Sequence, residues 1–319
     1  MGKQLRIVYM GTPDFAVAGL RALVENKYNV VAVITMPDKP AGRGYQIQYS
    51  PVKQYALEQG IDVLQPEKLK DPDFIETLRS YHADLQIVVA FRMLPEVVWT
   101  MPRLGTFNLH ASLLPQYRGA APINWAVMNG DKETGVTTFM LKHEIDTGNM
   151  ILQEKIAIGE DENVGSVHDR LMELGTGLIL RTVDLIEASD REGTPLSTTP
   201  QPVIEDLRPA PKIFKETCEI DFSKTASEIH NFVRGLSPYP AAWANLTING
   251  IEYANVKIFH VTPYPTLNSK PSNQTATLNS KLSTLNYPCA DGYISIDELQ
   301  LPGKKRMDAK ALLNGLRAH

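Results

Sequence analysis

The stretch "TFNLHASLLPQYRGAAP", from Thr106 to Pro122, decides the fold. Its first residues alternate between apolar side chains (Phe107 and Leu109) and polar side chains (Asn108 and His110), which is typical of a strand. A proline-bearing loop with small residues then ends the strand. Because residues two apart in a strand point to the same face, we expect Asn108 and His110 to project together at the strand end.

Strand-like and helix-like patterns alternate on both sides of this stretch. The run "LRIVYM" is followed by the helical pattern "FAVAGLRALVEN", for which Thr12 suits the N-cap and Pro13 the first helical position. The buried strand pattern "ADLQIVVAF" precedes "TFNLH", and a long amphipathic helix, "SVHDRLMELGTGLILRTVDLIEAS", comes later. This order predicts an α/β fold with a doubly wound, mostly parallel sheet. Ligands of such sheets bind at the carboxyl ends of the strands, where His110 lies.

The second half of the chain has a different pattern. Residues 192–211, "EGTPLSTTPQPVIEDLRPAP", are rich in Pro, Ser and Thr and predict an extended linker. It divides an α/β domain (residues 1–191) from residues 212–319, where antiparallel strands surround an Asn249-Gly250 turn. These strands predict a smaller, OB-like β-barrel. Its stretches "TPYPTLNSKPSNQTATLNSKLSTLN" and "GYISIDELQL" are expected to form a long loop or weak strands and a strand pair, respectively.

Composition excludes several classes of protein. Hydrophobic residues make up 43% of the 319 residues, but no apolar run approaches the roughly 20 residues of a membrane span. The amino terminus has no signal-peptide layout. Cys218 and Cys289 are the two cysteines and form no CxxC pair, which argues against disulfides and structural zinc. We therefore expect a cytoplasmic protein without a metal site.

The charge is distributed unevenly along the chain. Residues 208–319 carry 13 Lys and Arg against nine Asp and Glu, a surplus of four, whereas the remainder carries −8. The basic turn "PGKKRM" adds Lys304, Lys305 and Arg306 near the carboxyl terminus. The loop "PDKPAGRGYQIQYSP" is long for an α/β connection and places Arg43 between two glycines. These features favour a polyanionic partner, although ordinary surface charge explains a surplus of this size equally well.

The first strand ends in "GTPDF", which lacks the extra glycines of a GxGxxG dinucleotide site. No GxxxxGK[ST] phosphate loop occurs either. We therefore expect no nucleotide cofactor and interpret "GTPDF" as the start of a helix. Its position at the end of the first strand still places Phe15 near the expected cleft.

Asn108 and His110 have the chemistry of an oxyanion site. The amide donates hydrogen bonds, and a protonated imidazole stabilises negative charge on a tetrahedral intermediate. A nearby carboxylate would favour the charged imidazole, and "KHEIDTGNMI" offers Glu144 and Asp146. The residues alone leave both open. "HEIDT" is not the HExxH of zinc proteases, and the absence of a GxSxG elbow argues against Ser112 as a hydrolase nucleophile.

The run "FNLHASLLPQYRGAAPINWAVMNGDKETGVTTFMLKHEIDTGNMI" resembles the formyltransferase superfamily that uses 10-formyltetrahydrofolate. The motifs "GTPDFA", "PDKPAGRG", "SPVK", "RGAAPI", "ETGVT" and "PGKKRMDAKALL" are similar to those of its branch that acts on initiator methionyl-tRNA. The resemblance covers nearly the whole chain. It implies transfer of a formyl group to the methionine amino group in translation initiation. A relative acting on a sugar nucleotide or on formyl-folate itself is the alternative.

The resemblance also implies roles for particular residues. Asn108, His110 and Asp146 match the catalytic trio, so the resemblance, unlike the spacing, selects Asp146 over Glu144. The implied folate contacts are Ser112, Leu113, Leu114, Pro115 and Phe91. The implied tRNA contacts are Arg43, Phe15, Lys304, Lys305 and Arg306. The implied partners are initiator methionyl-tRNA and 10-formyltetrahydrofolate as co-substrate, with no metal and no membrane, and the protein is expected to be a monomer.

Overall fold

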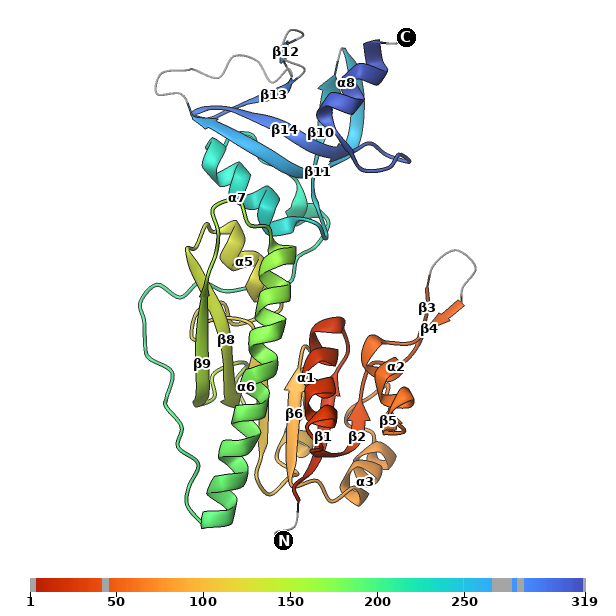
Figure 1. Ribbon diagram of the computed structural model, residues 1–319, viewed down its shortest axis with the longest axis vertical. Coiled ribbons are helices and arrows are strands. Elements are labelled where there is room, and N and C mark those ends of the chain that lie inside the picture. Colours follow the sequence, from red (N-terminus) through yellow and green to blue (C-terminus); the bar gives the residue numbers. More distant parts are fainter. Residues whose placement is uncertain (1–3, 42–45, 249, 266–276, 280–283, 318–319) are drawn as a thin grey trace. The chain divides into compact units, whose positions relative to one another are not determined.

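The computed structural model describes residues 4–41, 46–248, 250–265, 277–279 and 284–317 (Figure 1). The chain folds into two compact units, each built from separate segments of sequence. The first unit comprises Met1–Gly119, Gly135–Ile156 and His168–Pro209. The second comprises Ala120–Thr134, Ala157–Val167 and Ala210–His319.

A seven-stranded sheet with the order β5-β2-β1-β6-β7-β8-β9 forms the centre of the first unit. Its strands are β1 (Arg6–Gly11), β2 (Asn29–Ile34), β5 (Asp62–Leu64), β6 (Leu85–Val89), β7 (Thr106–His110), β8 (Glu133–Met140) and β9 (Met150–Ala157). The first five pair in parallel, and β8 pairs with β7 in the antiparallel direction. The predicted α/β fold with a mostly parallel sheet is confirmed. The carboxyl ends of the neighbouring strands β1, β6 and β7 therefore meet at one edge.

Helices cover this sheet: α1 (Asp14–Glu25), α2 (Pro51–Glu58), α3 (Pro72–Ser80), α4 (Glu96–Trp99) and α6 (Val164–Glu192). Side chains cap α2 and α3, because Ser50 accepts from the Lys53 amide and Asp71 from the Asp73 amide. The expected N-cap of α1 was wrong. Pro13, in an extended conformation, occupies the N-cap, and the Thr12 hydroxyl does not cap the helix.

The long helix α6 packs against the strand that carries His110. A Cβ atom at Gly175 would lie 2.8 Å from Leu109 Cδ2, so α6 approaches β7 closely here and a larger residue would have to displace the Leu109 side chain. The buried hydroxyls of Thr138 on β8 and Thr182 on α6 lie 2.9 Å apart and hydrogen-bond to each other. These contacts fix β7 and β8 against the helix and hold the carboxyl end of β7 in place.

The long loop after β2 contains a small antiparallel hairpin, β3 (Lys39–Ala41) and β4 (Gln46–Gln48). Arg43, the expected basic contact in this loop, lies outside the described residues. Polar side chains fasten the base of the loop to α2. Lys53 Nζ pairs with Asp38 and donates to Gln65 Oε1 at 2.7 Å, and the Gln65 amide donates to Asp38 Oδ1 at 2.8 Å.

The second unit contains an antiparallel sheet with the order β10-β11-β14-β13-β12, in which β15 pairs with β14. Its strands are β10 (Ala242–Ile248), β11 (Ile251–Pro265), β12 (Thr277–Asn279), β13 (Thr284–Cys289), β14 (Gly292–Gln300) and β15 (Met307–Asp308). The sheet curls into a half-barrel, which confirms the smaller β fold (Figure 1). "GYISIDELQL" forms the single strand β14 rather than a pair, because β11 and β13 pair with it along most of its length.

Helices close the core of the second unit: α5 (Pro122–Met128), α7 (Ala226–Leu236) and α8 (Ala309–Arg317), with a short 3₁₀ helix at Glu216–Cys218. α5 packs closely on α7, since a Cβ atom at Gly235 would lie 2.8 Å from the Met128 backbone nitrogen. Asn124 Nδ2 donates to the Gly235 carbonyl at 2.8 Å. The helix that follows "RGAAP" is therefore part of the second unit.

Candidate active site

β7 places two predicted site residues at the carboxyl edge of the first sheet. Asn108 lies between Val88 of β6 and Phe139 of β8, and His110 ends the strand opposite Thr137. Alternation along the strand puts Asn108 and His110 on the same face, as the sequence predicted. Asn108 is half-buried, and the carboxamide makes no hydrogen bond with another described residue. Its two N–H donors are therefore available to a ligand.

The His110 imidazole is 7% exposed and is held by its backbone surroundings. Nε2 lies 2.8 Å from the carbonyl oxygen of Tyr117, which can only accept a hydrogen bond, so Nε2 carries a proton. Tyr117 adopts a left-handed φ of 59°, which brings its carbonyl to the ring. Nδ1 is the ring nitrogen that remains for chemistry.

Nδ1 of His110 lies 3.9 Å from Oδ2 of Asp146. The distance exceeds that of a hydrogen bond but is short enough for an attraction between opposite charges in a site where both side chains are largely buried. The Gly119 amide donates to the same Oδ2 at 3.1 Å. Glu144 is exposed, so the carboxylate beside His110 belongs to Asp146.

The loop that carries Asp146 has a tight backbone. Asp146 adopts a left-handed φ of 54°, which is uncommon for residues other than glycine. A Cβ atom at Gly148 would lie 1.6 Å from the Met140 carbonyl oxygen, so this position requires glycine. The turn "DTG" thus brings the Asp146 carboxylate back toward the end of β7.

The residues after His110 are fixed to β8 and β9. The Ser112 hydroxyl donates to the Gln116 carbonyl at 2.7 Å, and the Thr137 hydroxyl donates to the Ser112 carbonyl at 2.7 Å. Gln153 Nε2 donates to the Leu114 carbonyl at 3.1 Å. The Leu114–Pro115 peptide bond is cis. Ser112 and Leu114 are buried and Leu113 is half-buried, so the loop offers backbone groups and apolar surface rather than the serine hydroxyl.

Phe91 and Arg92 follow the neighbouring strand β6. Phe91 packs against an apolar cluster that includes Met10, Val88 and Phe74. The Arg92 guanidinium lies 5.6 Å from the Phe91 ring and donates to the carbonyls of Pro66 and Glu67. Burial lowers the pKa of Arg92. Arg92 therefore fastens the turn after β6 to the segment after β5, a role that the sequence does not indicate.

The remaining predicted residues lie in different surroundings. Phe15 is 8% exposed, and its ring packs edge-on against His168 at 5.2 Å. In the second unit, Lys304 and Lys305 are exposed in the turn between β14 and β15. Arg306 lies over the Phe259 ring at 4.2 Å and pairs with Glu298, so its charge is partly engaged within the unit.

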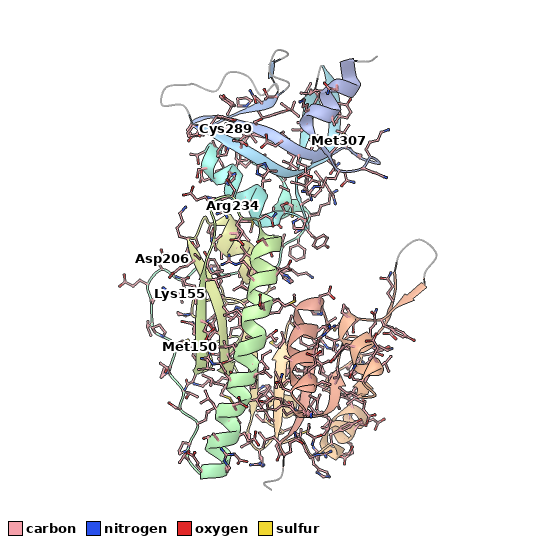
Figure 2. All side chains as sticks on the ribbon, viewed as in Figure 1. Met150, Lys155, Asp206, Arg234, Cys289 and Met307 are labelled. Carbon is pink, nitrogen blue, oxygen red and sulfur yellow. The ribbon has the colours of Figure 1, made fainter. Side chains whose placement is uncertain are left out.

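Sequence reasoning missed Gln201, which lies in the segment predicted as a linker. Gln201 Nε2 donates to the carbonyls of Asp146 and Gly148, and its Oε1 accepts from Arg118. Figure 2 labels Met150 and Lys155 on β9 and Asp206 on this segment, which passes along the same side of the first unit. Its composition resembles that of a linker, so nothing in the sequence marks Gln201.

Across the described ranges, no three His, Cys, Asp or Glu side chains gather in a way that could hold a metal ion. None of the described helices combines the length and apolar character needed to cross a membrane.

Comparison with known proteins identifies both halves of the chain. Residues 5–183 match the formyl transferase family model, and residues 212–317 match the model of the formyl transferase C-terminal domain. A methionyl-tRNA formyltransferase of Bacteroides thetaiotaomicron is 59% identical over 99% of this chain and 97% of its own length. One from Porphyromonas gingivalis is 50% identical over 98% of this chain and 96% of its own length.

Solved structures share the fold at lower identity. An N-formyltransferase from Helicobacter canadensis, in complex with folinic acid and dTDP-3-aminofucose, has a TM-score of 0.63 at 21% identity and covers 95% of this chain and 100% of its own. HypX from Aquifex aeolicus, in complex with tetrahydrofolic acid, has a TM-score of 0.58 at 19% identity, over 98% of this chain and 47% of its own. The Porphyromonas gingivalis and Bacteroides thetaiotaomicron relatives, by contrast, are 50% and 59% identical to this chain over nearly the full length of both sequences. The chain therefore belongs to the formyl transferase family, among the methionyl-tRNA formyltransferases.

Proposed function

We propose that this protein transfers the formyl group of 10-formyltetrahydrofolate to the amino group of methionine on initiator methionyl-tRNA, for translation initiation. The observation that carries the mechanism is the meeting of Asn108, His110 and Asp146 at the carboxyl edge of the sheet. Strand alternation places the Asn108 side chain on the same face as His110, and Asp146 Oδ2 lies 3.9 Å from His110 Nδ1.

The amine attacks the formyl carbon directly, without a covalent intermediate on the protein. Negative charge then develops on the formyl oxygen, where the Asn108 carboxamide and protonated His110 stabilise it. Because Nε2 of His110 is committed to the Tyr117 carbonyl, Nδ1 is the nitrogen that faces this oxygen. Because these donors are already in position, they need not reorganise as the charge forms. This preorganisation provides most of the rate acceleration.

Asp146 stabilises the positive imidazole and receives the proton that the attacking amine loses, through a bridging water. The bond between the methionine nitrogen and the formyl carbon forms first and gives the tetrahedral oxyanion. Collapse of this oxyanion restores the carbonyl and breaks the bond from that carbon to N10 of the folate. The His110–Asp146 pair returns the proton to N10 of the leaving tetrahydrofolate. Protons and bonds balance, and no further co-reactant is needed.

The residues of the site fit a folate co-substrate. The Thr12 hydroxyl at the end of β1 is buried without a partner among the described residues, and the Asn108 carboxamide has free donors. Ser112, Leu113, Leu114 and Pro115, with Phe91, would hold the co-substrate on one side of the reacting carbon. Arg43, Lys304, Lys305 and Arg306 are the proposed tRNA contacts that reach phosphates, because phosphate recognition depends on basic groups. Phe15, which is apolar and largely buried, is a proposed tRNA contact that this argument from charge does not support.

The proposed organisation follows from these roles. In this proposal residues 1–191 carry the catalytic domain, residues 192–211 the linker and residues 212–319 the tRNA-binding domain. Ala120–Thr134 and Ala157–Val167 pack with the second unit, so the functional division does not coincide with the two compact units. The protein acts as a cytoplasmic monomer, and its reaction needs no metal.

The deciding experiment measures formyl transfer from 10-formyltetrahydrofolate to charged initiator tRNA. Elongator methionyl-tRNA and a dTDP-amino sugar serve as alternative acceptors. We expect rapid transfer to the initiator alone. Equal rates on both tRNAs would contradict the assigned specificity, and transfer to the sugar alone would assign the chain to the small-molecule branch. Release of formate without any acceptor would indicate a hydrolase.

A further inference from the structure

We infer that Gln201 is a positioning residue that holds the Asp146 carboxylate beside His110. This inference rests on the proposed role of Asp146 in formyl transfer. Gln201 lies in the Pro-rich segment after α6, about 55 residues from Asp146 in sequence. The segment therefore does more than connect domains: it contributes to the geometry of the site.

The carboxamide of Gln201 uses its full hydrogen-bonding capacity between two loops. Nε2 donates to the carbonyls of Asp146 at 2.8 Å and Gly148 at 2.9 Å. Oε1 accepts from Arg118 Nη2 at 2.6 Å and Arg118 Nε at 3.2 Å. Guanidinium only donates and carbonyls only accept, so the orientation of the amide is fixed by its partners.

These bonds close a ring around the Asp146 carboxylate. Gly119 follows Arg118 in the chain, and its amide donates to Asp146 Oδ2 at 3.1 Å. The path runs from the Asp146 carboxylate through Gly119 and Arg118 to Gln201, and back to the Asp146 carbonyl. Both the backbone and the side chain of Asp146 are thus tied to the loop that also supplies the Tyr117 carbonyl to His110.

The ring matters because the Asp146 backbone is in an unfavourable conformation. A left-handed φ of 54° at a non-glycine residue persists only where surrounding contacts impose it. The segment before Gln201 adds two such contacts. The backbones of Thr199 and Met150 pair at 2.8 Å in both directions, and Asn149 Nδ2 donates to Thr198 Oγ1 at 3.3 Å. Gln201 is the member of this segment that reaches the strained residue itself.

Gln201→Glu removes the hydrogen bonds that Gln201 donates to the loop of Asp146 but keeps those that it accepts from Arg118. A carboxylate still accepts from Arg118, but it has no hydrogen to donate and would place a negative oxygen against the carbonyls of Asp146 and Gly148. We expect kcat for formyl transfer to fall roughly 10- to 100-fold, as for other small misplacements of catalytic groups, with KM for both substrates nearly unchanged. Gln201→Met, which is similar in length and neutral, should lower kcat in the same direction if the glutamate variant does not fold.

A double-mutant cycle distinguishes positioning from general stabilisation. In an Asp146→Asn background, Gln201→Glu should lower kcat far less than it does in the wild type, because the group that it positions is already lost. Val203→Ala is the matched control, since Val203 lies in the same segment with a fully exposed side chain. This control should leave kcat unchanged. Equal effects of Gln201→Glu in both backgrounds, or an unchanged kcat in the wild type, would overturn the inference.

Hydrogen-exchange mass spectrometry gives a readout that does not depend on activity. Gln201→Glu should speed exchange in the peptide covering residues 141–150, whereas Val203→Ala should not. Unchanged exchange there would contradict the ring even if kcat fell. If the wild type formylates initiator methionyl-tRNA and neither kcat nor exchange responds to Gln201, the proposed function stands and the positioning role fails. If exchange responds but the wild type forms no formyl-methionine, the proposed function fails instead.

Discussion

At the scale of single residues, the site depends on which of two nearby carboxylates reaches His110. Glu144 and Asp146 stand in the same turn, yet Glu144 is exposed and Asp146 is turned inward by its left-handed backbone. The Gly119 amide then orients the Asp146 carboxylate. A difference of two positions in a turn therefore separates a surface charge from a proposed catalytic group.

This contrast predicts different outcomes for two conservative variants. Asp146→Asn keeps the size of the side chain but removes its charge and basicity, so kcat for formyl transfer should fall by about 10²- to 10⁴-fold. Glu144→Gln should leave kcat close to that of the wild type. Steady-state kinetics with initiator methionyl-tRNA measure both. The proposed mechanism would be falsified if Asp146→Asn retained wild-type kcat.

A second prediction concerns His260 on β11, which pairs with Asp297 at 2.9 Å. The hydrogen bond from His260 to Asp297 raises the pKa of His260 despite partial burial. A raised pKa means that this pair contributes stability below the ordinary pKa of histidine and that the contribution is lost as pH rises through the folded value. His260→Gln should therefore destabilise the protein more at about pH 6 than at about pH 9.

The free energy of unfolding of wild type and His260→Gln, measured at both pH values, tests this sign. Burial disfavours the ionised Asp297, but hydrogen bonds from His260 and Thr262 outweigh it and hold the pKa of Asp297 below its usual value. Asp297 thus stays ionised over this range, and the pH dependence should come from His260. A larger loss at the higher pH would contradict the pairing.

Part of the site could be predicted from sequence at this scale. The shared face of Asn108 and His110 follows from strand alternation alone. Sequence spacing could not decide between Glu144 and Asp146. The backbone conformation of the turn determines which of the two side chains faces inward, and spacing does not report that conformation. Gln201 was missed because its partners lie in loops remote in sequence, and no local pattern reports such a contact.

At the scale of elements, the order of strands and helices followed the hydrophobic pattern, whereas helix ends followed local hydrogen bonding. The sequence placed the start of α1 one residue early, since Pro13 rather than Thr12 took the N-cap. β14 remained one strand because both of its neighbours, β11 and β13, pair along most of its length. Tertiary pairing, which a local pattern does not contain, therefore decided β14, whereas local backbone hydrogen bonding decided the start of α1.

The start of α7 provides an element-scale prediction. Thr225 and Glu228 form a capping box: the Glu228 amide donates to Thr225 Oγ1 at 3.2 Å, and the Thr225 amide donates to Glu228 Oε2 at 2.8 Å. Thr225→Ala removes the hydroxyl acceptor and should cost about 1 kcal/mol of helix stability. Faster amide exchange at the start of α7 would report this loss. Thr225→Ser keeps the acceptor and should exchange like the wild type, so equal exchange in all three proteins would refute the cap.

At the scale of the whole molecule, charge separates the two ends of the sequence. The surplus of basic residues after residue 208 is small, and part of it is engaged, since Arg306 pairs with Glu298. Lys304 and Lys305 are exposed in the same turn and are the better candidates for phosphate contacts. The overall count of charges is therefore a weaker guide to RNA binding than the exposure of individual lysines.

Replacement of both lysines by glutamine tests this view. Without these lysines, fewer counterions are released from the tRNA on binding, so the affinity for tRNA should fall. The slope of the logarithm of the binding constant against the logarithm of the salt concentration should become shallower by about one to two units. Lys68→Gln with Lys70→Gln, two exposed lysines of the first unit, is the matched control. Binding titrations at several salt concentrations would exclude a role for the turn if both double variants kept the wild-type slope.

The second unit incorporates α5, whose residues are separated from α7 by nearly a hundred positions of sequence. During protein synthesis, α5 leaves the ribosome long before α7, the helix on which it packs. The apolar side of α5 therefore stays uncovered until α7 has been synthesised. Folding of the second unit therefore cannot begin around α5 alone and depends on the later emergence of α7. For the same reason, a chimera that exchanges only residues 210–319 between two relatives packs a foreign α7 against the resident α5. A successful exchange should therefore include both helices.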